Sequence, residues 1–194
     1  MTDTMWPKSE VQREIGSKQI AAGQARTAVI RCHYDAAIED VWNAWTEPDR
    51  LNRWFLQVSG DLHLGGTFQF EGNAGGEIMR CEPPRLLAVT WIYGDMPVDE
   101  VELRLTPGEN GGTTVEIEHA TVSRMVDWEG QRFDVIPGVG AGWEVPLAYA
   151  LPAYLRGELP DKPSSEWFEF TPEMLQISED IAQEWTDLTA ASGT

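Results

Sequence analysis

The sequence predicts an α+β protein in which an antiparallel sheet of six to seven strands packs against one long C-terminal helix. Strand-like segments follow one another between residues 61 and 119 with no helical segment between them, which indicates a curved meander rather than a parallel sheet. Near the C-terminal end, large apolar residues recur every four positions and predict the long helix: Trp143, Leu147, Leu151 and Leu155.

The first elements are a strand and two short helices. Residues 27–34 are rich in β-forming residues and predict the first strand. An apolar stripe with helical spacing follows, at Ile38, Val41, Trp42 and Trp45. Pro48 suits the first position of a second helix, which ends near Trp54 and Phe55. We expect Trp42 and Trp45 to be structural, whereas Trp54 and Phe55 are placed to border a cavity.

The remaining strands are predicted from turns and from alternation. Residues 61–64 and 67–71 are expected to form a hairpin around the Gly65-Gly66 turn. Residues 77–82 and 86–93 predict the next two strands, which Pro83-Pro84 separates. In the last two strands, residues 100–105 and 114–119, apolar and polar residues alternate, as a sheet with one buried and one wet face requires.

The chain divides into three parts. Residues 1–25 are expected to form an arm with at most a short helix, residues 26–157 the main domain, and residues 158–194 an acidic extension with its own helix. The long helix is expected from Gly142 to about Gly157, with a kink at Pro152. Large apolar residues in the extension are expected to pack on the outer surface of the sheet or on a second copy of the chain, as a homodimer: Trp167, Phe168, Phe170, Trp185 and Leu188.

Composition excludes several classes of function. The net charge of −18 argues against nucleic acid and against anionic membrane surfaces as partners. The sequence contains no apolar run of the ~20 residues that span a bilayer and no export signal, so we expect a cytoplasmic protein with no membrane insertion. Cys32 and Cys81 are then expected to be reduced thiols. The three histidines are dispersed and no phosphate-binding loop occurs, so neither a metal nor a cofactor is expected.

Several short motifs, in their order and spacing, resemble the START-like (SRPBCC) superfamily, in particular the branch related to the C-terminal domain of the activator of Hsp90 ATPase. The motifs are Val41-Trp42, Thr46-Glu47-Pro48, Trp54-Phe55, Gly65-Gly66-Thr67-Phe68, Glu82-Pro83-Pro84-Arg85-Leu86, Thr90-Trp91 and Gly142-Trp143. The resemblance covers about two thirds of the chain and implies the helix-grip fold, in which the curved sheet holds the long helix. Pro146 and Pro152 depart from the family pattern within that helix.

In this superfamily an apolar cavity lies between the sheet and the long helix. The sequence leaves open whether the two apolar faces pack fully or enclose roughly 300–1,000 Å³. Residues on these faces are the candidates for a ligand-binding wall, with plain core packing as the alternative for the apolar ones. They are Trp54, Phe68, Phe70, Met79, Trp91, Tyr93, His119, Trp143, Leu147 and Tyr154.

His119 is the polar member of this set. It continues the buried face of Val115 and Ile117, which places it where the sheet ends. We therefore expect either a polar anchor or acid–base group at the cavity mouth, or a histidine bonded to a backbone carbonyl. No other residue is identified as catalytic.

Three functions are compatible with these features. The favoured one is binding of a hydrophobic small molecule, including a lipid, in a stress-related or regulatory role. The first alternative is a co-chaperone-like protein-interaction module with a collapsed cavity, and the second is a small enzyme of the cyclase or hydrolase kind. A binding protein is favoured over an enzyme. The chain has no recognisable nucleophile motif, but this is weak evidence, because the resemblance implies that enzymes of this superfamily hold their substrate in shape with a few polar groups.

Overall fold

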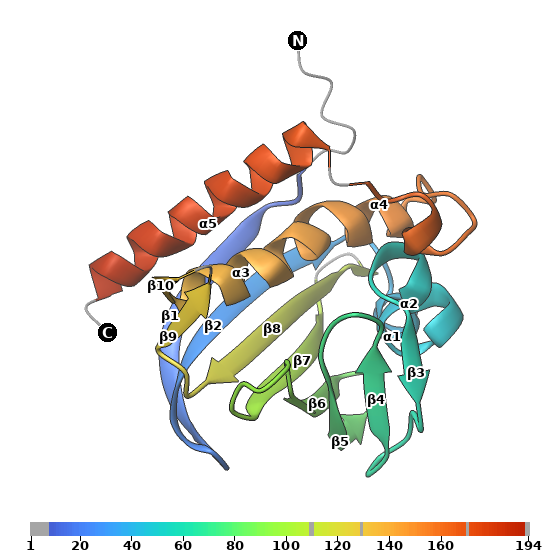
Figure 1. Cartoon of the computed structure of the whole chain (residues 1–194). Coiled ribbons are helices and arrows are strands. Elements are labelled where there is room, and N and C mark those ends of the chain that lie inside the picture. The colour runs from blue at the N-terminus through green and yellow to red at the C-terminus, as the bar shows by residue number, and fades with distance from the viewer. Residues whose placement is uncertain (1–7, 109–110, 129, 170, 193–194) are drawn as a thin grey trace.

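The computed structural model describes residues 8–108, 111–128, 130–169 and 171–192. Its main element is an eight-stranded antiparallel sheet with the strand order β1-β2-β8-β7-β6-β5-β4-β3 (Figure 1). The strands are β1 (Val11–Ile20), β2 (Gly23–Tyr34), β3 (Val58–Gly60), β4 (Thr67–Phe70), β5 (Gly75–Glu82), β6 (Leu86–Trp91), β7 (Asp99–Pro107) and β8 (Thr113–Thr121). The predicted α+β class and helix-grip arrangement are confirmed, with eight strands in place of six to seven.

The helices lie on one face of this sheet. The short helices α1 (Ile38–Thr46) and α2 (Pro48–Trp54) follow β2, as predicted. The long helix runs through α3 (Val135–Val145), the π-helical turn η2 (Pro146–Ala150) and α4 (Leu151–Leu155). A 3-10 turn, η3 (Ser164–Glu166), leads to α5 (Pro172–Ser192), which lies alongside α3 near β1 (Figure 1). Among the described residues, no helix combines the length and the apolar character needed to cross a bilayer.

The additional strand comes from the segment that was expected to be an arm. β1 pairs with β2 over its whole length, so that Val11 lies opposite Cys32 and Ile20 lies opposite Gly23. Val11 and Ile15 pack against the main core. The expectation of an arm with at most a short helix is therefore wrong for residues 11–20, which extend the sheet. The strand was not predicted because a charged residue, Arg13, occupies an inward position, so apolar and polar residues do not alternate regularly in the sequence.

The predicted hairpin around Gly65-Gly66 is present, but its first strand is residues 58–60 instead of 61–64, and its connection is a six-residue loop instead of a two-residue turn. The edge strand is β3, and residues 61–66 form a compact loop in which Leu62 and Leu64 are exposed. The backbone of this loop is packed so closely that only glycine fits at position 66, since a Cβ there would lie 2.0 Å from the carbonyl oxygen of Asp61. In β5 the register shifts between Ile78 and Arg80, which forms a β-bulge.

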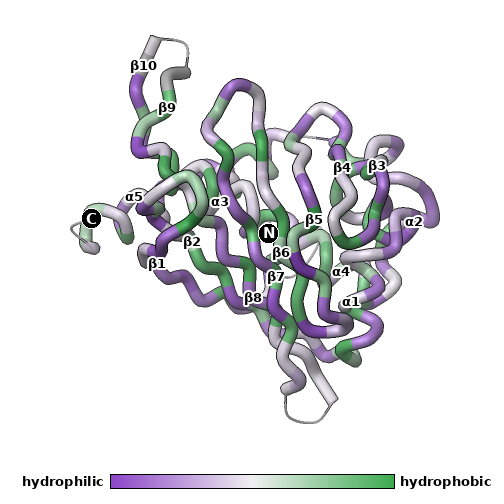
Figure 2. Tube along the Cα trace, turned by 90° about the horizontal axis from the view of Figure 1, so that it is seen from below, coloured by the Kyte–Doolittle hydropathy of each residue, from purple (hydrophilic) through white to green (hydrophobic). Residues whose placement is uncertain are grey.

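The long helix begins seven residues earlier than predicted, at Val135 instead of Gly142. The side chain of Asp134 caps it by accepting the backbone N–H of Ile136 at 2.9 Å. The segment before it, for which no strand was predicted, contains the hairpin β9 (Met125–Trp128) and β10 (Gln131–Asp134). This hairpin projects from the rest of the chain (Figure 2).

The two prolines are accommodated by the π-helical turn, in which hydrogen bonds span five residues instead of four. In this register Pro152 lies where an N–H would donate to the carbonyl of Leu147, and proline has none. The Tyr34 hydroxyl donates to that carbonyl instead, with an O–O distance of 2.7 Å. The backbone N–H of Ser9 donates to the neighbouring carbonyl of Ala148 at 2.9 Å. The irregularity that was expected at Pro152 therefore takes the form of a π turn directly before it.

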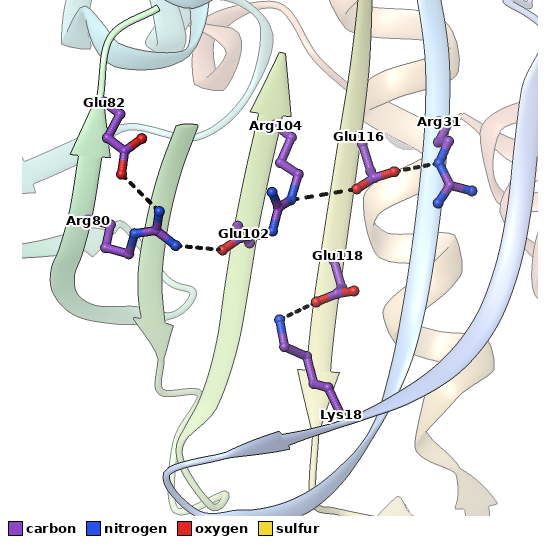
Figure 3. Close-up of polar contacts among 8 residues, drawn as sticks. All are labelled: Lys18, Arg31, Arg80, Glu82, Glu102, Arg104, Glu116 and Glu118. Carbon is purple, nitrogen blue, oxygen red and sulfur yellow. Dashed lines mark hydrogen bonds and ion pairs between the residues drawn. The ribbon is translucent and has the colours of Figure 1, made fainter. Parts of the chain in front are cut away.

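The outer face of the sheet is covered by charged side chains from neighbouring strands. Some ion pairs join residues that lie opposite each other on neighbouring strands, such as Arg31 with Glu116, and others join residues two apart on one strand, such as Arg80 with Glu82 at 2.8 Å (Figure 3). Glu116 and Glu118 point to this wet face, as their alternation with apolar residues predicts. Each exposed pair contributes only about 0–1 kcal/mol, so the network favours solubility more than stability.

α5 is attached to the body through a buried carboxylate. Glu144 of α3 is fully buried and accepts hydrogen bonds from Arg13 Nε at 2.6 Å and from Trp185 Nε1 at 2.9 Å. One residue from each of α3, β1 and α5 therefore meets at this point. Trp185 itself is fully buried against Gly140. α5 thus packs on the long helix through Trp185, and the expectation that this side chain packs on the outer surface of the sheet is wrong. Phe170, which belongs to the same expectation, lies outside the described residues.

Candidate functional site

A cavity of about 1500 Å³ follows one side of α3. The end of α2, the loop between β6 and β7, β10 and α5 form its other boundaries. Its walls are mostly apolar, and its volume exceeds the roughly 300–1,000 Å³ of typical small-molecule sites. Aromatic residues make up much of the wall nearest the sheet: Trp54, Phe55, Trp91, Tyr93 and Trp143.

A second and smaller cavity, of about 140 Å³, lies between the sheet and the long helix. It is enclosed by apolar residues of the core, including Phe68, Phe70 and Ile117. Trp91 and Trp143 line both cavities and so form the wall between them. Where the family is expected to have one cavity, this chain therefore has a small inner space and a large outer one.

The aromatic wall is held by contacts between its own rings. Phe55 stacks on Trp143, with a centroid distance of 5.7 Å and an interplanar angle of 13°. Trp91 approaches Trp143 at 5.0 Å, and Phe70 meets Phe55 edge-on at 5.3 Å. Such pairs contribute about 0.5–1.5 kcal/mol each beyond the area that they bury. The wall is thus formed before any ligand arrives.

A chain of three polar side chains crosses this wall. The indole Nε1 of Trp143 donates to Nδ1 of His119 at 2.9 Å. Nε2 of His119 lies 3.0 Å from Oδ2 of Asp99. All three residues are buried, with less than a tenth of their surface exposed, and all three line the large cavity.

The hydrogen bond from Trp143 determines the tautomer of His119. An indole N–H only donates, so Nδ1 of His119 must accept and carries no proton. The proton of the neutral imidazole therefore lies on Nε2 and is donated to Asp99. Asp99 accordingly accepts as a carboxylate, and its other oxygen, Oδ1, is buried without a hydrogen-bond partner among the described residues. Asn52 Oδ1 and Glu102 Oε1 are further buried acceptors of this kind, but of the three residues only Asp99 lines the large cavity.

Tyr149 adds a polar group on the same cavity wall. Burial, with a smaller contribution from the nearby charge of Glu144, raises the pKa of the Tyr149 hydroxyl above its usual value. This hydroxyl therefore stays protonated at neutral pH and is able to donate a hydrogen bond.

The structure distributes the ten predicted wall residues over four environments. The large cavity is lined by Trp54, Tyr93 and His119, the small one by Phe68 and Phe70, and both by Trp91 and Trp143. Three residues line neither cavity: Leu147 is fully buried in the core, Met79 is half-buried beside the β-bulge, and Tyr154 packs against α2. Tyr154 accepts a hydrogen bond from Arg50 Nε at 2.9 Å, and the guanidinium of Arg53 lies 5.1 Å from its ring.

His119 faces the cavity, as expected, but both of its ring nitrogens are bonded to neighbouring side chains. The polar atom that is left for a ligand belongs to Asp99, which the sequence analysis did not identify. A signal was present, because Asp99 shares the two-residue period of Val101, Leu103 and Leu105 and so points to the buried face. An acidic residue in phase with three buried apolar ones was the clue.

Metal binding finds no support in residues 8–108, 111–128, 130–169 and 171–192, where no group of three histidine, cysteine or acidic side chains is arranged to hold an ion. Cys32 and Cys81 are both free thiols. The site therefore consists of an aromatic wall, one unpartnered carboxylate oxygen and a tyrosine hydroxyl.

Comparison with solved structures identifies a similar protein whose match spans nearly all of both chains. CalU16 from Micromonospora echinospora is 42% identical, and its crystal structure matches with a TM-score of 0.77 over 92% of this chain and 97% of that chain. Its solution NMR structure matches with a TM-score of 0.80 over 98% and 99% of the two chains. The match to CalU16 thus extends over β1 and α5 as well as the main domain.

A more distant match shows the fold alone. PFC0360w, an Hsp90 activator from Plasmodium falciparum, is 17% identical and matches with a TM-score of 0.56 over 69% of this chain and 97% of that chain. No curated protein matches the sequence significantly. The family described as activator of Hsp90 ATPase homolog 1-like protein matches residues 35–156, which is more than half of the chain. The chain therefore belongs to this family, and the resemblance of its motifs is confirmed.

Proposed function

We propose that the chain binds an apolar small molecule in the large cavity beside α3. The observation that carries the proposal is a cavity of about 1500 Å³ with an aromatic wall. Asp99 lines this cavity, and its buried Oδ1 has no hydrogen-bond partner in the part of the chain that the structure describes. An apolar cavity with a few placed polar groups is the usual form of a small-molecule site. The open space also argues against the collapsed cavity expected of a pure protein-interaction module.

An enzyme is the second candidate, because Asp99 combines an available oxygen with a hydrogen bond from His119. A carboxylate held in this way inside an apolar cavity is suited to accept a proton from a bound substrate. Turnover of the captured ligand by the purified protein would distinguish this candidate from a binding protein. A stress-related or regulatory role stays a prediction from the family resemblance.

The cavity can be filled by substitution at Gly142. A Cβ at this position meets no atom within 4 Å, and Gly142 lines the cavity. Gly142→Leu is expected to project into the cavity and to weaken binding of the apolar dye Nile red at least fivefold, measured by its fluorescence. Gly142→Ala is the matched control, because it makes the same change of backbone freedom with little volume, and it is expected to bind like the wild type.

Native mass spectrometry of protein purified from its host provides the direct test. A co-purifying apolar compound that is retained by Gly142→Ala and lost from Gly142→Leu would support the proposal. Equal dye binding by all three proteins, or no dye binding by the wild type, would contradict it. The second result would favour the protein-interaction alternative.

A further inference from the structure

We propose that the ligand is an apolar amine, bound in its protonated form, with Asp99 as the partner of its ammonium group. This inference rests on the proposed function, since it names the chemical class that the same cavity takes. Three features support it: the charge of the buried Asp99 carboxylate, the excess of acidic residues around the cavity, and the aromatic wall.

Asp99 is available for a cation because its neighbours leave half of the carboxylate unused. His119 donates to Oδ2 from its Nε2 and is held neutral by the hydrogen bond from Trp143, so it supplies a donor but no positive charge. Oδ1 has no partner among the described residues and is screened from water. A buried carboxylate without a cationic partner is costly to maintain. An ammonium group would supply both the missing donor and the missing charge.

The charged residues around the cavity also favour a cation. Among the lining residues, four are acidic, Glu71, Asp95, Asp99 and Asp134, and one, Arg132, is basic. Arg26 pairs with Asp134 at 2.9 Å, so one of the four acids is already neutralised within the chain. The whole chain carries a net charge of −18. Electrostatic attraction therefore concentrates cations at this site and disfavours carboxylates and phosphates.

The aromatic wall adds a specific attraction. Trp91 is half-buried and lines the cavity together with Asp99, and its ring centroid lies 5.9 Å from that of His119. The face of an indole ring attracts a cation, and more strongly when water is excluded. An apolar body would contact Phe55 and Trp143, which stack on each other in the same wall. A neutral alcohol would satisfy Oδ1 by a hydrogen bond but would gain nothing from the charge.

We expect a cationic ligand to bind more tightly than a neutral one, and a neutral one more tightly than an anion. Three probes that share one ring system test this order. 1-Naphthylmethylamine is protonated at neutral pH, 1-naphthalenemethanol is neutral, and 1-naphthoic acid is anionic. Their affinities for the full chain are measured by isothermal titration calorimetry and by displacement of Nile red. We expect the amine to bind about tenfold more tightly than the alcohol, because a hydrogen bond between charged groups is stronger than a neutral one. The acid is expected to bind most weakly.

Asp99→Asn is the decisive variant, because the amide retains the shape and an acceptor for His119 but removes the charge. The preference for the amine over the alcohol is expected to disappear in it. Asp35→Asn is the matched control: Asp35 is fully exposed, the substitution removes the same charge, and the preference is expected to persist. The comparison of the three probes on the wild type does not depend on whether Asp99→Asn folds.

The outcomes separate the two proposals. If Nile red binds but the amine and the alcohol have equal affinity, or the acid binds most tightly, the inference about the amine is overturned and the cavity still binds apolar ligands. An unchanged preference in a folded Asp99→Asn variant also overturns it. If neither the dye nor any probe binds, the proposed function itself fails.

Discussion

The packing of α5 on α3 makes a sharp prediction for Gly140→Ala. Gly140 lies within α3, where a Cβ atom would come within 2.3, 2.4 and 2.7 Å of three ring atoms of Trp185. Non-bonded carbon atoms prefer about 3.5–4.0 Å, so one of the two helices must move by about 1 Å. Trp185 is fully buried and its Nε1 is bonded to Glu144, so the ring has little freedom to give way.

Two effects of opposite sign determine how much Gly140→Ala changes the free energy of unfolding. Helix propensity alone favours alanine over glycine by about 1 kcal/mol. Overpacking of a close contact costs about 1–3 kcal/mol, and the hydrogen bond between Trp185 and Glu144 is strained by the same movement. We therefore expect the free energy of unfolding to fall by about 1–2 kcal/mol, which corresponds to a decrease in Tm of roughly 2–8 °C for a chain of this length.

Gly142→Ala provides the control within the same helix. Its Cβ meets no atom within 4 Å, so only the propensity term applies and the free energy of unfolding is expected to rise by about 0.5–1 kcal/mol. Both variants are measured by urea unfolding, followed by tryptophan fluorescence. A Gly140→Ala protein that is as stable as the wild type would refute the reasoning, since it would mean that α5 does not pack closely on α3.

Two further predictions concern buried titratable groups. Glu144→Leu removes the buried acceptor that the half-buried Arg13 shares with Trp185, while Arg13 keeps its ion pair with Glu184. The free energy of unfolding is expected to fall by about 1–3 kcal/mol, and the double variant with Arg13→Met should recover roughly half of that loss. Equal losses in both variants, measured by urea unfolding, would argue against a stabilising pair between Arg13 and Glu144. Burial raises the pKa of Cys32 from 9.0 to about 11. The unfolded thiol therefore ionises first, and the free energy of unfolding should decrease between about pH 9 and pH 11. Cys32→Ala should show a smaller decrease over this range, and an identical pH profile would contradict the assignment.

The fold was predictable where side-chain alternation is regular. In the middle of β7 and β8 every second residue is apolar and buried, so the faces of both strands follow from the sequence alone: Val101, Leu103, Leu105, Val115 and Ile117. β1 escaped prediction because Arg13 occupies an inward position. Its charge is compensated by Glu144, which is 131 residues away in the sequence, and no local pattern reveals such a pair.

The start of the long helix was also not predictable, because it depends on packing against a distant part of the chain. Its first two turns contain Pro137, Gly138 and Gly140, which have low helix propensity. Tertiary packing overrides that propensity, because Gly140 provides the space that Trp185 occupies. The advantage of a glycine there becomes visible only once α5 is in place.

The candidate site was predictable in part. Seven of the ten predicted wall residues line one or the other cavity, because strand parity and the family resemblance both point to the inner face. The division into two cavities depends on the mutual packing of Trp91 and Trp143, which a sequence pattern does not specify. The role of Asp99 depends on the tautomer of His119, and that follows only from the hydrogen bond of Trp143.

The π-helical turn has a consequence for how the sequence can vary during evolution. Two neighbouring carbonyl groups of this turn, those of Leu147 and Ala148, accept hydrogen bonds from other parts of the chain, and these parts use different kinds of donor. Ser9 donates through its main-chain N–H, so among related sequences any residue except proline is acceptable at this position. Tyr34 donates through its side chain, so its loss should be tolerated only in lineages in which residue 152 has regained an N–H. Substitutions at positions 34 and 152 are thus expected to occur together.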